Sequence, residues 1–229
     1  MRLFPLVSAL LLTASNIGPL MADDDDEYTR LQFETQASRQ VNNDSMRATL
    51  FVEVEESTPS RASSRATQTM NETLRKLQSD RELQARTGNL RTYPVNHDGS
   101  ISGWRARSEV IIESSNFPAA SAAIGSVAES MQIARIEFFV SPALRQTVEN
   151  ELADEAIAAF LEKAGRTAKS FGSKKFDVAE ASVINRGGST PVRPMMRSMA
   201  ADAPATAPEL RGGTTNMSVI VSGVILIER

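Results

Sequence analysis

The sequence predicts an α+β fold, in which helices pack on one face of a mostly antiparallel sheet, with the element order β-α-β-β-α-β-α-β-β. Three observations support this prediction. Apolar and acidic side chains alternate over residues 46–56, apolar residues recur at helical spacing over residues 62–77, and β-branched residues crowd the closing segment 216–228. The first six elements match the split β-α-β arrangement.

The first predicted strand has one apolar face and one polar face. Leu50, Val52 and Val54 point to one side, while Glu53 and Glu55 point to the other. This alternation is typical of a strand that covers a core with one face.

The first predicted helix begins at Thr58-Pro59, where a proline suits an early helical position. Its apolar stripe consists of Ala62, Ala66, Met70, Leu74 and Leu77.

The middle of the chain predicts a hairpin followed by a helix. A short segment around Leu90–Tyr93 lies between Gly88 and Pro94, and Asp98-Gly99 is a hairpin turn signal. A helix is expected from Pro118 to about Ser130, capped by Ser115 or Asn116. The strand between them places these residues on one face: Trp104, Ala106, Ser108, Val110 and Ile112.

The longest helix is predicted to follow a strand at Ile133–Val140. Ser141-Pro142 suits its start and Phe171-Gly172 its end. Acids gather in its first half and bases in its second half, which matches the helix dipole. At 1.5 Å per residue it spans roughly 45 Å. Its apolar stripe consists of Leu144, Val148, Leu152, Ala156, Phe160 and Ala164.

The last part of the chain predicts two strands around a linker. Residues Phe176–Ile184 are a strand candidate, and residues 186–213, rich in Gly, Pro, Ala and Met, are expected to form a mobile linker loop. The strand at Asn216–Glu228 is apolar on both faces, so we expect it to be central in the sheet or covered on both sides.

Composition excludes several classes of function. With 25 basic and 28 acidic residues the net charge is −3, which argues against nucleic acid as a partner. The chain has no cysteine, so disulfides, thiolate metal sites and cysteine nucleophiles are excluded. Its single histidine, His97, leaves no histidine cluster for a metal. We therefore expect no metal and no cofactor.

The N-terminus predicts export. Arg2 precedes a short apolar run over residues 3–14, and an acidic run follows from Asp23. The apolar run is shorter than the roughly 20 residues that span a bilayer. Residues 1–22 are therefore interpreted as a signal peptide ending at Ala22, with an uncleaved membrane anchor as the alternative. Residues 23–40 are expected to be an acidic flexible segment, and the protein periplasmic or secreted.

Four stretches carry a resemblance to a known family: Gly103–Val110, Phe138–Ser141, Ala153–Gly172 and Gly213–Ile227. In their order and spacing the chain resembles the bacterial SIMPL-domain family of periplasmic and secreted proteins. The likeness predicts one domain over residues 41–228 that contains the 186–213 loop.

The chain departs from the family pattern in two places. Asn42-Asn43-Asp44 replaces the usual glycine and proline at the entry of the first strand, and the long helix has fewer alanines. The resemblance implies an α+β subunit that assembles into ring-like oligomers in the bacterial envelope. It also implies no established enzymatic activity and, for some relatives, a link to stress.

The residues themselves indicate no catalytic site. His97 lies between Asn96 and Asp98 and is interpreted as an exposed turn histidine, since catalysis also needs an orienting group. No Gly-x-Ser-x-Gly motif occurs. Glu151 and Glu155 share a face of the long helix and are interpreted as solvated carboxylates.

Two groups of residues are candidates for binding. Trp104, Arg105 and Arg107 are a candidate subunit interface, with core packing as the alternative for Trp104. The thioethers of the 186–213 loop are candidates for Cu(I) binding or oxidant scavenging, with an incidental loop as the default. They belong to Met195, Met196 and Met199.

These observations predict an exported, non-enzymatic envelope protein that assembles with copies of itself and is connected with stress. The alternative is a monomeric periplasmic binding or scavenging protein that uses the 186–213 loop. Light scattering separates these two functions.

Overall fold

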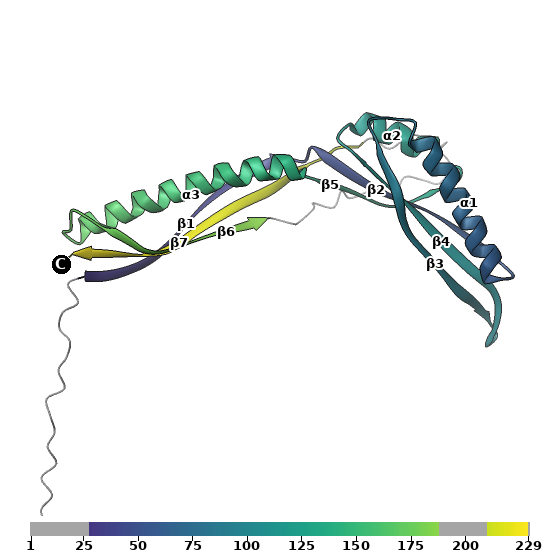
Figure 1. The fold of residues 1–229 in the computed structure, drawn as a ribbon, viewed down its shortest axis with the longest axis horizontal. Coiled ribbons are helices and arrows are strands. Elements are labelled where there is room, and N and C mark those ends of the chain that lie inside the picture. The colour runs from purple at the N-terminus through teal and green to yellow at the C-terminus, as the bar shows by residue number, and fades with distance from the viewer. Residues whose placement is uncertain (1–27, 188–209, 229) are drawn as a thin grey trace, which may run out of the picture.

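The computed structural model describes residues 28–187 and 210–228. The described chain forms an elongated molecule with two lobes, and in each lobe helices cover one face of an antiparallel sheet (Figure 1). The predicted α+β class is confirmed, but the strands form two sheets where one was expected. We call the lobes by their helices, the α3 lobe and the α1–α2 lobe.

The α3 lobe contains a three-stranded sheet in the order β1-β7-β6, covered by one long helix. Its elements are β1 (Tyr28–Asn42), α3 (Pro142–Ser170), β6 (Asp177–Gly187) and β7 (Thr214–Glu228).

The α1–α2 lobe contains a four-stranded sheet in the order β3-β4-β2-β5, with both shorter helices on one face. Its elements are β2 (Ser45–Glu56), α1 (Pro59–Leu77), β3 (Gln84–His97), β4 (Ser100–Ser114), α2 (Phe117–Ser126) and β5 (Gln132–Phe139).

Strand β1 corrects the prediction of a flexible segment over residues 23–40. Residues 28–40 belong to this strand, which pairs with β7 without a register shift from Tyr28 opposite Glu228 to Asn42 opposite Thr214. Every second side chain of β1 faces α3, and Leu31 and Phe33 pack on the core there. The flexible segment predicted from the acidic run was taken to continue to residue 40, so the alternation of side chains along β1 was not recognised. Residues 23–27 lie outside the described part.

Strand β7 is the central strand of its sheet, as its apolar sequence predicted. Only one of its faces is covered, because α3 lies on one side of the sheet. Its buried apolar side chains on that side are Met217, Val219, Val221, Ile225 and Ile227.

Helix α3 has the predicted start and end. The Ser141 side chain accepts from the backbone N–H of Leu144, and Gly172 follows the helix at φ +84°. Phe160 is buried against β7, with its ring centroid 4.8 Å from that of Phe33. A Cβ at Gly223 would lie 2.8 Å from the Phe160 ring, so only glycine leaves room for this ring.

Strand β3 is longer than the predicted segment Leu90–Tyr93. It continues past Pro94 because it is an edge strand, where a missing N–H costs no ladder hydrogen bond. The hairpin at Asp98-Gly99 is confirmed, with φ angles of 50° and 77°. Helix α2 ends at Ser126, four residues before the predicted end.

The connection between the lobes is held by two residues of the Asn42-Asn43-Asp44 segment. The Asn43 amide donates to the carbonyl of Gly212 at 2.7 Å, and its Oδ1 accepts from the Thr215 hydroxyl at 2.7 Å. Asp44 accepts from both the backbone N–H and the hydroxyl of Ser141, at 2.6 Å each. These hydrogen bonds join the three segments that connect the lobes: the one between β1 and β2, the one between β5 and α3, and the one before β7.

The predicted 186–213 loop is only partly described. Arg186 and Gly187 belong to β6, and Leu210 packs on the core of the α1–α2 lobe. Residues 188–209 lie outside the described part. In the portion of the chain that the structure covers, no helix combines the length and hydrophobicity needed to cross a bilayer.

Candidate interaction surfaces

The structure places His97 at the exposed tip of the β3–β4 hairpin. Its side chain is 81% exposed, and its Nε2 atom lies 3.4 Å from the Asp98 carboxylate. Within the described ranges no serine side chain is bonded to it, and the chain has no cysteine. Nor do those ranges contain three His, Cys, Asp or Glu side chains grouped to hold a metal ion.

The predicted interface residues lie on opposite faces of β4. Trp104 packs on Ala62, Ala66 and Ala106 beneath α1, which favours the core-packing alternative. Arg105 and Arg107 instead belong to the uncovered face of the sheet. The three residues therefore do not form one surface.

The uncovered face of the α1–α2 sheet carries arginine, glutamate and aromatic side chains. The Arg107 guanidinium lies 3.5 Å from the centroid of the Phe51 ring, and Arg105 binds Glu55 at 2.8 Å. Burial opposes ionisation of Glu113, but hydrogen bonds from Arg47 and Arg86 outweigh it and hold its pKa below the ordinary value. The charges on this face are largely satisfied within the subunit.

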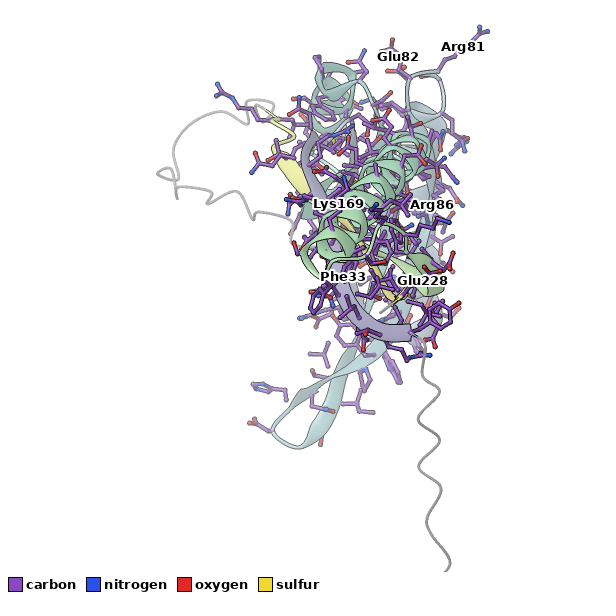
Figure 2. The ribbon with its side chains drawn as sticks, turned by 90° about the vertical axis from the view of Figure 1, so that its left-hand side faces the viewer. Phe33, Arg81, Glu82, Arg86, Lys169 and Glu228 are labelled. Carbon is purple, nitrogen blue, oxygen red and sulfur yellow. The ribbon has the colours of Figure 1, made fainter. Side chains whose placement is uncertain are left out.

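A polar groove of about 700 Å³ lies beside the connection between the lobes. Asp44 and Ser141 line it from one side, and Arg81 and Glu82 from the loop before β3. Figure 2 shows Arg81 and Glu82 extending outward from that loop, far from Lys169 and Phe33 of the α3 lobe. Burial opposes ionisation of Asp44, yet its hydrogen bonds from Ser141 lower its pKa. Asp44 and Ser141 are thus bonded to each other, and the Glu82 carboxylate accepts from the Asn116 amide at 2.7 Å.

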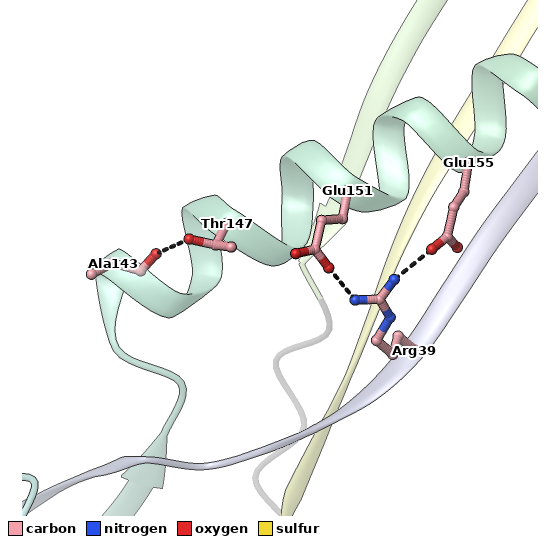
Figure 3. A network of polar contacts seen from close by, with 5 residues as sticks. All are labelled: Arg39, Ala143, Thr147, Glu151 and Glu155. Atoms are coloured by element: carbon pink, nitrogen blue, oxygen red, sulfur yellow. Dashed lines mark hydrogen bonds and ion pairs between the residues drawn. The ribbon is translucent and has the colours of Figure 1, made fainter.

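The two carboxylates predicted to be solvated bind an arginine of β1. Glu151 and Glu155 each form an ion pair with Arg39, as Figure 3 shows. The pairs raise the pKa of Arg39, chiefly through the hydrogen bond to Glu151. Sequence reasoning missed Arg39 because it assigned this part of the chain to a flexible segment. The arrangement fixes α3 to β1.

Helix α3 covers the α3 lobe unevenly. On the β1 side, Arg39 is held by α3, and the Lys163 ammonium donates to the backbone carbonyl of Glu34 at 3.1 Å. On the β6 side, the Asn185 amide donates to Glu149 at 3.2 Å, and this is the single side-chain hydrogen bond between α3 and β6 in the described part of the chain. The helix therefore shields β1 and leaves β6 open.

Exposed apolar side chains line the open side. Ile157 and Leu161 lie eight and twelve residues after Glu149 along α3, so they lie on the β6 side of the helix. Val183 of β6 faces the same side of the sheet, because it pairs with the buried Val221. We call these three residues the β6 strip. Their exposed fractions are 38%, 45% and 47%.

The edge strands of the two lobes differ in their protection. Among the described strands, β3 carries Pro94 and two register shifts, and β5 has only eight residues. Prolines, bulges and short lengths discourage edge-to-edge pairing. Strand β6 contains neither proline nor lysine, and after one shift between Val178 and Glu180 it pairs regularly with β7 to Gly187. Its outer edge is thus less protected than those of β3 and β5, while the fourth edge strand, β1, is bound by side chains of α3.

Sequence reasoning located β6 but missed the strip. The signal was present in Val183-Ile184 and in the apolar pair Ile157 and Leu161, which falls outside the main stripe of α3. Met195, Met196 and Met199 lie outside the described residues, so the structure does not place the copper or oxidant site predicted there.

Comparison with protein-family models gives a match over residues 31–225 to the SIMPL model, described as a protein of unknown function (DUF541). A search of curated proteins finds no match. The matched range extends through both lobes and begins within β1. It covers most of the chain, and the chain therefore belongs to the SIMPL family.

Proposed function

We propose that this protein is an exported, non-enzymatic subunit of the cell envelope that assembles with copies of itself through the α3 lobe. The observation that carries the proposal is the unprotected outer edge of β6 beside the exposed β6 strip. An edge strand offers unpaired N–H and C=O groups to another strand, and exposed apolar side chains gain from being covered.

The other surfaces support this choice. On the uncovered face of the α1–α2 sheet, Arg105 and Glu113 already have partners within the subunit. The groove beside Asp44 is polar and internally bonded. Neither region offers the unsatisfied backbone groups that β6 does.

The export part of the proposal rests on residues 1–22. An apolar run behind Arg2 followed by an acidic run is typical of a cleaved signal peptide. Mass spectrometry of the protein recovered from the periplasm or medium should give an N-terminus at residue 23. Recovery only from the cytosol with residues 1–22 intact would contradict export.

Self-assembly is tested by light scattering and native mass spectrometry on residues 23–229 at micromolar concentration. We expect a mass that is a multiple of the monomer and that falls on dilution. A monomer over the whole concentration range would reject assembly and leave the monomeric binding protein as the better hypothesis. Native mass spectrometry also reports any small molecule that remains bound.

A further inference from the structure

The side-chain directions along β6 limit how this strand pairs with a second strand. From Glu180 to Arg186, even-numbered residues point to the uncovered face of the sheet and odd-numbered residues to the α3 face. The register shift between Val178 and Glu180 sets this phase. In an antiparallel pair, residues directly opposite one another point to the same face.

When β6 pairs with β6 of a second copy in antiparallel orientation, one register places apolar side chains opposite apolar ones and opposite charges opposite each other. When the two-fold axis passes through Val183, each Val183 faces the other on the α3 side. Glu180 then stands opposite Arg186 of the second copy, twice, on the uncovered face. Centring the pair on Ser182 would instead place Glu180 opposite Ile184 and leave its charge unmatched.

The two charged groups are available for this pairing. Within the described ranges Arg186 forms no ion pair. Glu180 has one, a contact of 3.4 Å with Arg30, and the side chains of Glu180 and Arg30 are both more than half exposed. Opposite charges across a strand pair stabilise it, and like charges destabilise it. The β6 edge is therefore self-complementary.

We propose that two copies of this chain pair β6 with β6 in antiparallel orientation about a two-fold axis at Val183, which joins two three-stranded sheets into one of six strands. This inference rests on the self-assembly proposed above and names its contact. Two-fold contacts use the same surface on both subunits, and they are the commonest in homo-oligomers. The pairing also continues the β6 strip across the axis.

A single cysteine tests the register, because the chain contains none. Opposed residues of an antiparallel pair have Cα atoms about 4.5 or 5.5 Å apart, and both distances suit a disulfide. We expect Val183→Cys to give a covalent dimer on mild oxidation. Ile101→Cys, at an exposed site near the β3–β4 turn, is the matched control and should remain monomeric under denaturing conditions.

The outcomes separate this contact from self-assembly in general. If scattering shows an oligomer but Val183→Cys does not cross-link, the register is wrong and the proposed function stands. If Val183→Cys cross-links only in a double variant that also carries Thr35→Cys, the contact is a head-to-tail pairing of β6 with β1. This result would also overturn the two-fold contact. A monomer in every measurement rejects both proposals.

Exchange of the charged pair gives an independent test. Glu180→Arg or Arg186→Glu alone should raise the dissociation constant of the dimer about tenfold, because like charges then face each other. The double variant should return to within about threefold of the original, since the pair is restored in reverse. The Arg30 contact is lost in Glu180→Arg and in the double variant alike. A double variant as weak as the single ones would refute the proposed pairing.

Unchanged circular dichroism and Trp104 fluorescence should accompany every variant. Ile101, Glu180, Val183 and Arg186 are exposed, so their variants are expected to fold, whereas Thr35 is half-buried and its variant needs this check most.

Discussion

The α1–α2 lobe and the α3 lobe use the same architecture, an antiparallel sheet with helices on one face, but they differ in how completely the helices cover it. In the α1–α2 lobe the edge strand β3 carries Pro94 and the edge strand β5 is short. In the α3 lobe the single helix leans toward β1 and leaves β6 with its side chains exposed. The edges of the first lobe are thus better protected than the β6 edge of the second lobe, which is the surface that we propose for assembly.

The largest effect is expected from a cavity in the core of the α3 lobe, which also tests whether the two lobes unfold separately. Phe160→Ala should destabilise the α3 lobe by about 3–5 kcal/mol, because it opens a cavity against Phe33 and β7. The single tryptophan, Trp104, reports on the other lobe. In urea titrations the circular dichroism should show an early transition, while Trp104 fluorescence should keep its midpoint.

The matched variant for the other core is Ile112→Ala, which should cost about 2–5 kcal/mol and should move the Trp104 transition. If either variant shifts both signals together, the lobes unfold as one unit, and the comparison applies to their surfaces alone.

A smaller effect is expected at the connection between the lobes. Asp44→Asn replaces a carboxylate that accepts two hydrogen bonds from Ser141 with an amide that has one acceptor oxygen. The expected loss is about 1.5–3 kcal/mol, measured by urea denaturation. Asp98→Asn at the exposed hairpin tip is the control and should leave stability unchanged. Equal stability of both variants would show that the Asp44 contacts do not hold the connection.

The pH dependence of the α1–α2 lobe should depend on Glu113. Its pKa is lower in the folded than in the unfolded protein, so its contribution is fully present above the unfolded pKa, near 4.3, and is lost as pH falls through the folded value. Glu113→Gln should cost about 1 kcal/mol at pH 7. Trp104 fluorescence in urea at several pH values should show this difference shrinking below about pH 4. A constant difference would contradict the assignment.

The smallest effect is expected at His97. Because its side chain is exposed and pairs, among the described residues, with Asp98 alone, His97→Ala should change stability by less than about 0.5 kcal/mol. Light scattering should give the same mass as for the unsubstituted protein. A change in mass would place the β3–β4 hairpin in an interface and weaken the contrast between the two lobes.

The sequence predicted the helices better than the division into lobes. Periodicity and caps located α1 and α3 closely, since Thr58 and Ser141 accept the expected N–H groups. Strand β1 was missed because polar residues fill its uncovered face and an acidic run precedes it. The separation into two sheets depends on which strands pair, and alternation along one strand carries no information about its neighbour. For the same reason, the β6 strip emerged only when the position of α3 was known.

The pairing of β1 with β7 has a consequence for the order of folding. Residues 45–139 of the α1–α2 lobe are continuous in the chain, whereas Tyr28 finds its partner only at Glu228. Closing so long a loop is slow compared with forming contacts between near neighbours in sequence. On an emerging polypeptide the α1–α2 lobe can close early, while β1 and β6 must wait for β7, with which both of them pair. The edge that we assign to assembly therefore forms only after β7 has been synthesised and has paired with β6.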